Sequence, residues 1–139
     1  MALCAVLFLA IGVVLARFLS AENVEREDIL AVLQAQARGD APAELVLLGE
    51  CAPASRCAAA VRASAASLKR SGAVKIISLK SSTNSSLTSS TGTTRVAWTV
   101  IGRLPVVQCV RVRRTGNLLS GVSVRLLTLS APIGNEADC

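Results

Sequence analysis

Four cysteines are the residues of this chain best placed to form covalent bonds. Cys51, Cys57, Cys109 and Cys139 form an even set in a chain of 139 residues, whereas Cys4 lies in an apolar run. Such a set in a small domain is typical of disulfides formed outside the cytoplasm. A Cys51–Cys57 bond would close a short loop, and a Cys109–Cys139 bond would hold the polar tail against the domain. Two other pairings are open, and we expect two disulfides, with free buried thiols as the alternative.

The usual groups for metal binding and acid–base catalysis are scarce. The chain has no His and no Tyr, and no Asp or Glu lies between Cys51 and Asn135. The cysteine spacings match no zinc-binding pattern, so we expect no metal and no cofactor. No carboxylate from the predicted strands or the third helix can therefore act as a general base. We therefore expect a protein that is not an enzyme, with Ser/Lys or Cys chemistry as the weaker alternative.

Basic residues dominate that same stretch, and the whole chain carries a net charge of +6. Four arginines occupy alternate positions on strands that we expect to be neighbours: Arg95, Arg111, Arg113 and Arg125. This pattern predicts an anion-binding surface for an envelope polymer, lipid headgroups or an acidic protein. A solvated sheet face is the simpler alternative. Nucleic acid is not expected, because no aromatic residue is interleaved with these arginines to stack on bases.

Trp98 has two interpretations. It alternates with Val96 and Val100 in a predicted strand, which favours a place in the core. The alternative is that its ring lines a small apolar cavity at the mouth of the fold.

Residues 2–19 are apolar except for Arg17. A membrane-spanning helix needs about 20 predominantly apolar residues. We therefore predict an N-terminal membrane anchor over residues 1–21, followed by one domain over residues 22–139. A cleaved signal peptide and a buried core helix are alternatives, and the basic residues that usually precede such a leader are missing.

The first half of the domain is predicted to be helical. Ser20 and Asn23 are candidate N-caps for a helix whose buried face carries Ile29, Val32, Leu33 and Ala37. Gly39 and Asp40 would end it and cap a short second helix that contains Pro42. A third helix is expected over residues 55–70, with Cys57, Val61, Ala65 and Leu68 on one face.

Period-two patterns begin near residue 73 and predict four to five antiparallel strands. In the first, Val74, Ile76 and Ser78 are expected on one face and Lys75, Ile77 and Leu79 on the other. A short edge strand is expected around Leu87, and a tight hairpin turn at Thr115-Gly116-Asn117. Helices followed by strands indicate an α+β fold, with the helices gathered on one face of the sheet.

This order resembles the NTF2-like (cystatin-like) α+β superfamily, in which a bent sheet wraps a long helix to form a cone. The resemblance rests on ILAVLQAQARGDAPAELVLL, TRVAWTVIG, PVVQCVRVRRTGN and LLSGVSVRLL, and it covers residues 22–130. Small bacterial members tethered by a single N-terminal span have a similar layout. The superfamily hosts enzymes, binding modules and assembly scaffolds, so the resemblance implies a fold and no single activity.

These observations favour a non-enzymatic binding or assembly module of the bacterial cell envelope. We expect it to be attached to the membrane through residues 2–19, with its domain outside the cytoplasm and a homodimer as a further expectation. The expected partners are an envelope protein or an anionic polymer. A secreted domain that holds a small apolar ligand in its cone is the alternative.

Overall fold

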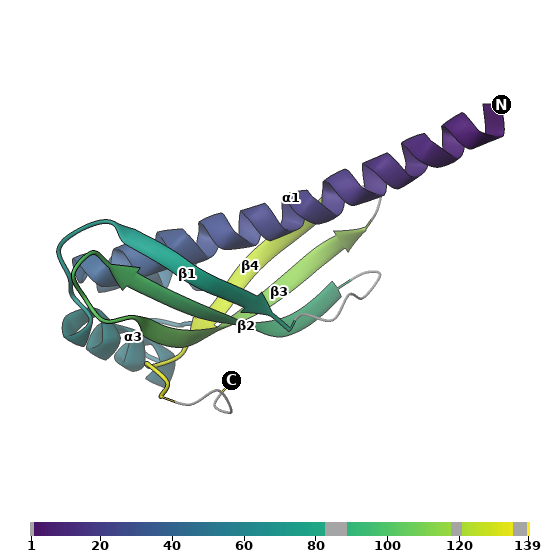
Figure 1. Ribbon diagram of the computed structural model, residues 1–139. Helices are drawn as coiled ribbons and strands as arrows, with labels where there is room; N and C mark the ends of the chain where they lie inside the picture. Colours follow the sequence, from purple (N-terminus) through teal and green to yellow (C-terminus); the bar gives the residue numbers. More distant parts are fainter. Residues whose placement is uncertain (1, 83–88, 118–120, 135–138) are drawn as a thin grey trace.

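The fold is α+β. The computed structural model describes residues 2–82, 89–117, 121–134 and 139, and its elements are α1 (Ala2–Arg38), α2 (Ala41–Leu47), α3 (Arg56–Ser67), β1 (Val74–Ser81), β2 (Ser89–Val100), β3 (Val106–Asn117) and β4 (Gly121–Leu129). The four strands form one antiparallel sheet in the order β1-β2-β3-β4. Helix α1 lies along this sheet, and its N-terminal end projects beyond it (Figure 1). The predicted class and a count of four strands are confirmed for the described residues.

Helix α1 is longer than expected. Ser20 and Asn23 do not cap a new helix, because the apolar leader and the predicted first helix form one continuous element of 37 residues. No Gly or Pro lies between Gly12 and Gly39 to interrupt it. The predicted boundary at residue 21 therefore falls inside a helix. Among the described residues, no helix has the length and apolar character that a bilayer crossing requires.

The end of α1 and the two short helices agree with the sequence. Gly39 has φ of 74°, a left-handed conformation that suits glycine and stops α1. Asp40 caps α2 by accepting a hydrogen bond from the backbone N–H of Ala43 at 3.1 Å. Ser55 caps α3 in the same way through the N–H of Ala58. Helix α3 is shorter than the predicted 55–70 and ends at Ser67.

Two register shifts alter the predicted strand faces. In β1 the pairing jumps from Ile76 opposite Trp98 to Ser78 opposite Ala97, so Ile77 is an unpaired extra residue and is 54% exposed. Leu79 then pairs with Val96 and joins the core, whereas Ser78 moves to the other face. The predicted assignment of Ser78 and Leu79 is therefore wrong. The second shift lies between β3 and β4, and there the bulged residue Leu127 is buried.

The predicted hairpin turn at Thr115-Gly116-Asn117 is also wrong. All three residues belong to β3, and Asn117 pairs with Gly121. Gly116 has φ of 139°, a conformation that suits glycine, and it still pairs with Val122 in the sheet. The edge strand predicted around Leu87 lies outside the described residues.

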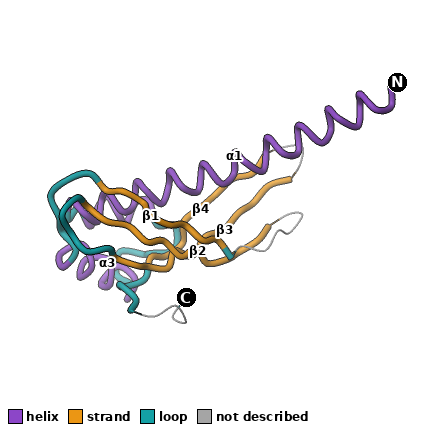
Figure 2. The backbone as a smooth tube through the Cα atoms, in the orientation of Figure 1, coloured by secondary structure: helices purple, strands orange, loops and turns teal. Residues whose placement is uncertain are grey.

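The hydrophobic core lies between α1 and one face of the sheet. Figure 2 shows how α1 lies along the sheet. From α1 it receives the predicted stripe of Ile29, Val32, Leu33 and Ala37, all almost fully buried. Val61 and Leu68, in and just after α3, join the same cluster, together with alternate residues of the strands. We call the sheet face that packs on α1 the inner face, and the opposite one the outer face.

Both disulfides are present. Cys51 bonds Cys57 and Cys109 bonds Cys139, with Cα–Cα distances of 5.3 Å and 5.7 Å. After β4 the chain follows β3: Ser130 and Ile133 donate backbone hydrogen bonds to the carbonyls of Cys109 and Val107. Among the described cysteines only Cys4 is free, and it is exposed on α1.

Candidate functional site

The outer face of the sheet carries a diagonal row of basic side chains. Lys80 of β1 lies directly opposite Arg95 of β2, and Arg113 of β3 lies directly opposite Arg125 of β4. Arg111 of β3 lies between the two pairs. It is two residues before Arg113 on the same strand, and on the outer face it is the diagonal neighbour of Arg95. We call these five residues the basic stripe: Lys80, Arg95, Arg111, Arg113 and Arg125.

The stripe is accessible along most of its length. Lys80, Arg111, Arg113 and Arg125 are exposed, and Arg95 is half-buried. Their neighbours in sequence point inward: Val110, Val112 and Val124 are buried in the core. The strands therefore display all four arginines predicted from the sequence on one surface, and the pairing of β1 with β2 adds Lys80.

Like charges stand directly opposite each other at both ends of the stripe. Such cross-strand pairs destabilise a sheet. The strands themselves supply no Asp or Glu to offset this repulsion. Glu50, after α2, reaches the stripe from outside the sheet: it accepts a hydrogen bond from Arg113 and forms an ion pair with it at 2.7 Å. The stripe therefore gathers five basic side chains on one face of the sheet.

Hydroxyl side chains separate the basic ones. Thr91, Thr93, Thr115 and Ser123 occupy outer-face positions of the same strands, and each is at least partly exposed. Trp98 points the other way. Its ring is fully buried in the core, where its Nε1–H donates to Gln108 Oε1 at 2.7 Å and the Arg70 guanidinium lies 5.4 Å from the ring centroid. The structure thus places Trp98 in the core and away from the stripe.

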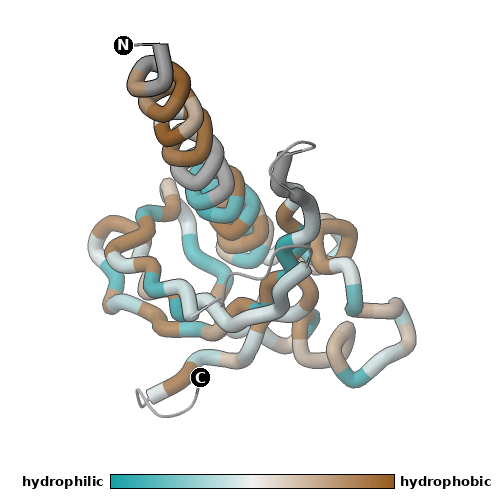
Figure 3. Tube along the Cα trace, turned by 90° about the vertical axis from the view of Figure 1, so that its right-hand side faces the viewer, coloured by the Kyte–Doolittle hydropathy of each residue, from teal (hydrophilic) through white to brown (hydrophobic). Residues whose placement is uncertain are grey.

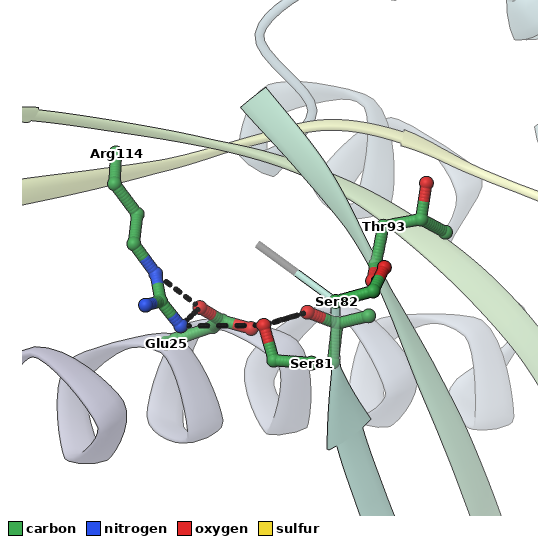
Figure 4. A network of polar contacts seen from close by, with 6 residues as sticks. Glu25, Ser81, Ser82, Thr93 and Arg114 are labelled. Carbon is green, nitrogen blue, oxygen red and sulfur yellow. Dashed lines mark hydrogen bonds and ion pairs between the residues drawn. The ribbon is translucent and has the colours of Figure 1, made fainter. Parts of the chain in front are cut away.

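A second polar group lies on the inner face, where α1 leaves the sheet (Figure 4). The carboxylate of Glu25 is almost fully buried and accepts hydrogen bonds from Nε and Nη2 of Arg114 and from the hydroxyl of Thr94. Ser81 completes the group by contacting both Thr94 and Arg114. A buried charge paired and hydrogen-bonded in this way is satisfied, so this group fixes α1 to β1, β2 and β3.

A carboxylate beside two hydroxyls is also the arrangement of a general base and its nucleophile. Here Thr94 is fully buried and Glu25 is 1% exposed. The Arg114 guanidinium pairs with the carboxylate and occupies the hydrogen-bonding positions that a substrate would need. The group therefore has a structural role.

Glu44 is the other buried acid. It projects from α2 into the interior, where Gln36 Nε2 of α1 donates to Glu44 Oε1 at 3.4 Å. Burial raises the pKa of Glu44 to about 7. Glu44 Oε2 and Gln36 Oε1 have no hydrogen-bond partner among the described residues. Protonation of Glu44 removes its buried charge and adds a hydrogen-bond donor beside these acceptors.

A shallow pocket of about 250 Å³ lies between α1, the end of α2 and β4. Val46, Leu47 and Leu126 give it apolar walls, and Asp28 and Arg125 add opposite charges. Burial, and next the negative charge of Glu27, raise the pKa of Asp28 above its usual range. Arg125 belongs to both the pocket and the stripe, so the pocket adjoins one end of the stripe.

The N-terminal part of α1 is apolar and extends away from the domain (Figure 3). Large hydrophobic side chains there are 40–77% exposed: Val6, Leu7, Phe8, Leu9, Ile11, Val13, Val14 and Leu15. They surround the helix on all sides, because they occupy nearly consecutive positions. We call this segment, residues 2–16, the apolar extension.

Sequence reasoning found the four arginines, the disulfide cysteines and the apolar extension, but missed Lys80, Glu25, Gln36 and Glu44. Lys80 directly follows the residues assigned to the first predicted strand, and its pairing with Arg95 depends on the bulge in β1. Glu25 follows the candidate caps Ser20 and Asn23, and its inward position depends on the continuation of the helix through them. Glu44 follows a helix cap, where an acid is ordinarily exposed.

Comparisons with known proteins return no relatives. No family model matches the chain, and neither a curated protein nor a solved structure is significantly similar to it. The resemblance to the NTF2-like superfamily therefore stays a prediction.

Proposed function

We propose that this protein is a non-enzymatic module of the bacterial cell envelope. Its apolar extension associates with a membrane, and its disulfide-bonded domain presents the outer sheet face outside the cytoplasm. The observation that carries this proposal is the apolar extension: a helical segment with large hydrophobic side chains exposed on every side.

Exposed apolar surface of this extent marks a site of membrane or protein contact. Contact with one protein surface would cover one side of a helix and leave the others in water, whereas lipid covers all sides. Each buried CH₂ group contributes about 0.8 kcal/mol, so a segment of eight such side chains gains a large free energy from transfer into lipid. The apolar extension is proposed to insert into the hydrocarbon region of the bilayer, whether or not it crosses the membrane.

Two features support a location outside the cytoplasm. The Cys51–Cys57 and Cys109–Cys139 disulfides persist in oxidising compartments and are rare in the bacterial cytoplasm. The second disulfide also ties the C-terminal residue to a strand, which is the kind of cross-link that small extracellular domains use.

A binding role is favoured over catalysis by the placement of the acids. Glu25 is bound by Arg114 in the interior, and Glu44 is fully buried beside Gln36. The exposed outer face offers Arg, Lys, Thr and Ser side chains, which bind anions well and lack a group that titrates near neutral pH.

The proposal is tested by vesicle flotation of the full chain. The protein is diluted from detergent into vesicles of mixed neutral and anionic lipid and then centrifuged through a density gradient. The parent is expected to float with the vesicles. The double variant Leu9→Asp/Val13→Asp should stay at the bottom, because each carboxylate costs several kcal/mol in the hydrocarbon.

The matched control is Val46→Asp/Ile101→Asp. These two side chains are 85% and 90% exposed, but they belong to the domain and not to the apolar extension. The control should float as the parent does. Flotation of the Leu9/Val13 variant, or loss of flotation in both variants, would contradict the proposal.

A further inference from the structure

The basic stripe has a shape that distinguishes between partners. Adjacent cross-strand side chains lie roughly 5 Å apart and diagonal ones roughly 7–8 Å apart. From Lys80 on one edge strand to Arg125 on the other, the stripe therefore extends over roughly 20 Å of the sheet. It is one basic residue wide along this path, so it matches a linear anion better than a compact one.

We propose that the basic stripe binds a linear phosphodiester polymer of the cell envelope, one without nucleobases. The inference rests on the proposed function only for the location of the domain. The binding itself is a property of the sheet and can be measured without a membrane.

The side chains on the outer face favour phosphate over a protein partner. Protein interfaces have a central cluster of aromatic or aliphatic residues that supplies most of the binding energy. Among the described outer-face positions around the stripe, Cys109 lies opposite Arg95, and most of the others hold hydroxyl residues, such as Thr91, Thr93, Thr115 and Ser123. Guanidinium groups pair with phosphate through two parallel hydrogen bonds, and nearby hydroxyls donate to the remaining oxygens.

The same face argues against recognition of bases. Single-stranded nucleic acid is held by aromatic side chains on which its bases stack. Trp98 is the only Trp of the chain, there is no Tyr, and both Phe residues precede residue 20. Since the Trp98 ring is fully buried on the inner side, the stripe can bind a backbone and has no described platform for a base.

Arg113 lies directly opposite Arg125, and like charges at such positions weaken a sheet. A phosphate between the two guanidinium groups would convert this repulsion into attraction. Glu50 already does this in part for Arg113, and it therefore competes with the polymer for that guanidinium.

The test uses the full chain in non-ionic detergent and fluorescently labelled poly(glycerol phosphate), with binding followed by anisotropy from 50 to 200 mM salt. Five phosphate contacts predict a slope of log K against log salt of about −3.5. Arg113→Gln/Arg125→Gln should weaken binding at least tenfold at low salt and reduce the slope by about 1.4.

A matched control removes the same net charge elsewhere. Arg56 and Arg103 are exposed and lie outside the stripe, so Arg56→Gln/Arg103→Gln should change the affinity less than twofold. A loss equal to that of the stripe variant would show a general charge effect and overturn the proposal. The thermal unfolding midpoints of both variants should equal or exceed that of the parent, since no core contact is removed.

The Glu50→Gln variant should have the opposite effect on the affinity for the polymer. It releases Arg113 from its ion pair, so binding should tighten several-fold, and weaker or unchanged binding would contradict the proposed site.

Two further probes identify the partner class. Polyglutamate binding as tightly as the phosphate polymer would indicate an acidic protein, and oligothymidylate binding more than tenfold tighter would indicate nucleic acid. Either result overturns the proposal, whatever the outcome of the flotation assay.

Discussion

Glu44 and Gln36 are a buried pair of side chains, each with one oxygen that lacks a hydrogen-bond donor among the described residues. With Glu44 ionised, two acceptor oxygens remain without a donor, and a carboxylate is buried beside them. Protonation removes the charge and adds the missing donor. The raised pKa of Glu44, about 7 against an ordinary 4.5, has the same physical cause, because burial disfavours the charged form.

This pair predicts that the domain is more stable in weak acid. The folded state holds the Glu44 proton more tightly than the unfolded state does. The contribution of this proton to the free energy of unfolding is therefore fully present below about pH 4.5 and is lost as the pH rises towards 7. The loss amounts to up to about 3.5 kcal/mol, at about 1.4 kcal/mol for each unit of pKa difference.

Denaturant unfolding of the full chain at pH 5.0 and pH 7.5 measures this difference. Glu44→Gln is the reference variant, because its amide presents a donor to Gln36 at every pH. The pH dependence of the variant should be flatter than that of the parent by most of the Glu44 contribution. Equal pH dependence in both proteins would show that Glu44 is not the group responsible.

At the scale of elements, the C-terminal tail is held by both hydrogen bonds and a disulfide. Ser130 bonds Cys109 through backbone and side chain, Ile133 bonds Val107, and Cys139 closes a loop of 30 residues on Cys109. A cross-link over that length restricts the unfolded chain strongly.

Cys139→Ser should therefore lower the free energy of unfolding by about 3 kcal/mol, because the unfolded chain regains the freedom of a loop of this size. The Cys51→Ser/Cys57→Ser variant should lose less, since its loop spans only six residues. Denaturant unfolding under non-reducing conditions compares the two. A larger loss in the Cys51/Cys57 variant would contradict this account of the tail.

The elements that depend on local sequence were predicted well. The caps Asp40 and Ser55 and the left-handed Gly39 confirm the predicted helix boundaries around them. The bulges at Ile77 and Leu127 were not predictable, because a bulge depends on the register of the partner strand as much as on its own residues. The turn assigned to Gly116 was wrong for a related reason: glycine permits a turn but does not require one.

The residues of the candidate site also divide into those that local sequence predicts and those that depend on tertiary packing. The four arginines were predictable because alternation alone places them on one face. The acids Glu25 and Glu44 were not, because their burial depends on the continuous α1 and on how α2 packs against it. A sequence pattern thus indicated the exposed chemistry and missed the buried pairs that hold the helices on the sheet.

In the whole molecule, charge and apolarity are separated in space. The acids from Glu22 to Glu50 lie on α1, on α2 and in the segments beside α2, and the basic stripe crosses the outer face. The apolar extension projects from the domain (Figures 1 and 3). This arrangement suits a domain attached at one end, with its outer face available to a partner. Membrane association through the extension is the central claim.

Cys4 provides the most direct measurement of that claim. It is the free, exposed cysteine of the described chain and lies within the apolar extension, so an environment-sensitive fluorophore can be attached there without disturbing the disulfides. On addition of lipid vesicles, the account predicts a blue shift of the emission and protection from an aqueous quencher. An emission spectrum and a quenching rate that stay those of the fluorophore in water would contradict it.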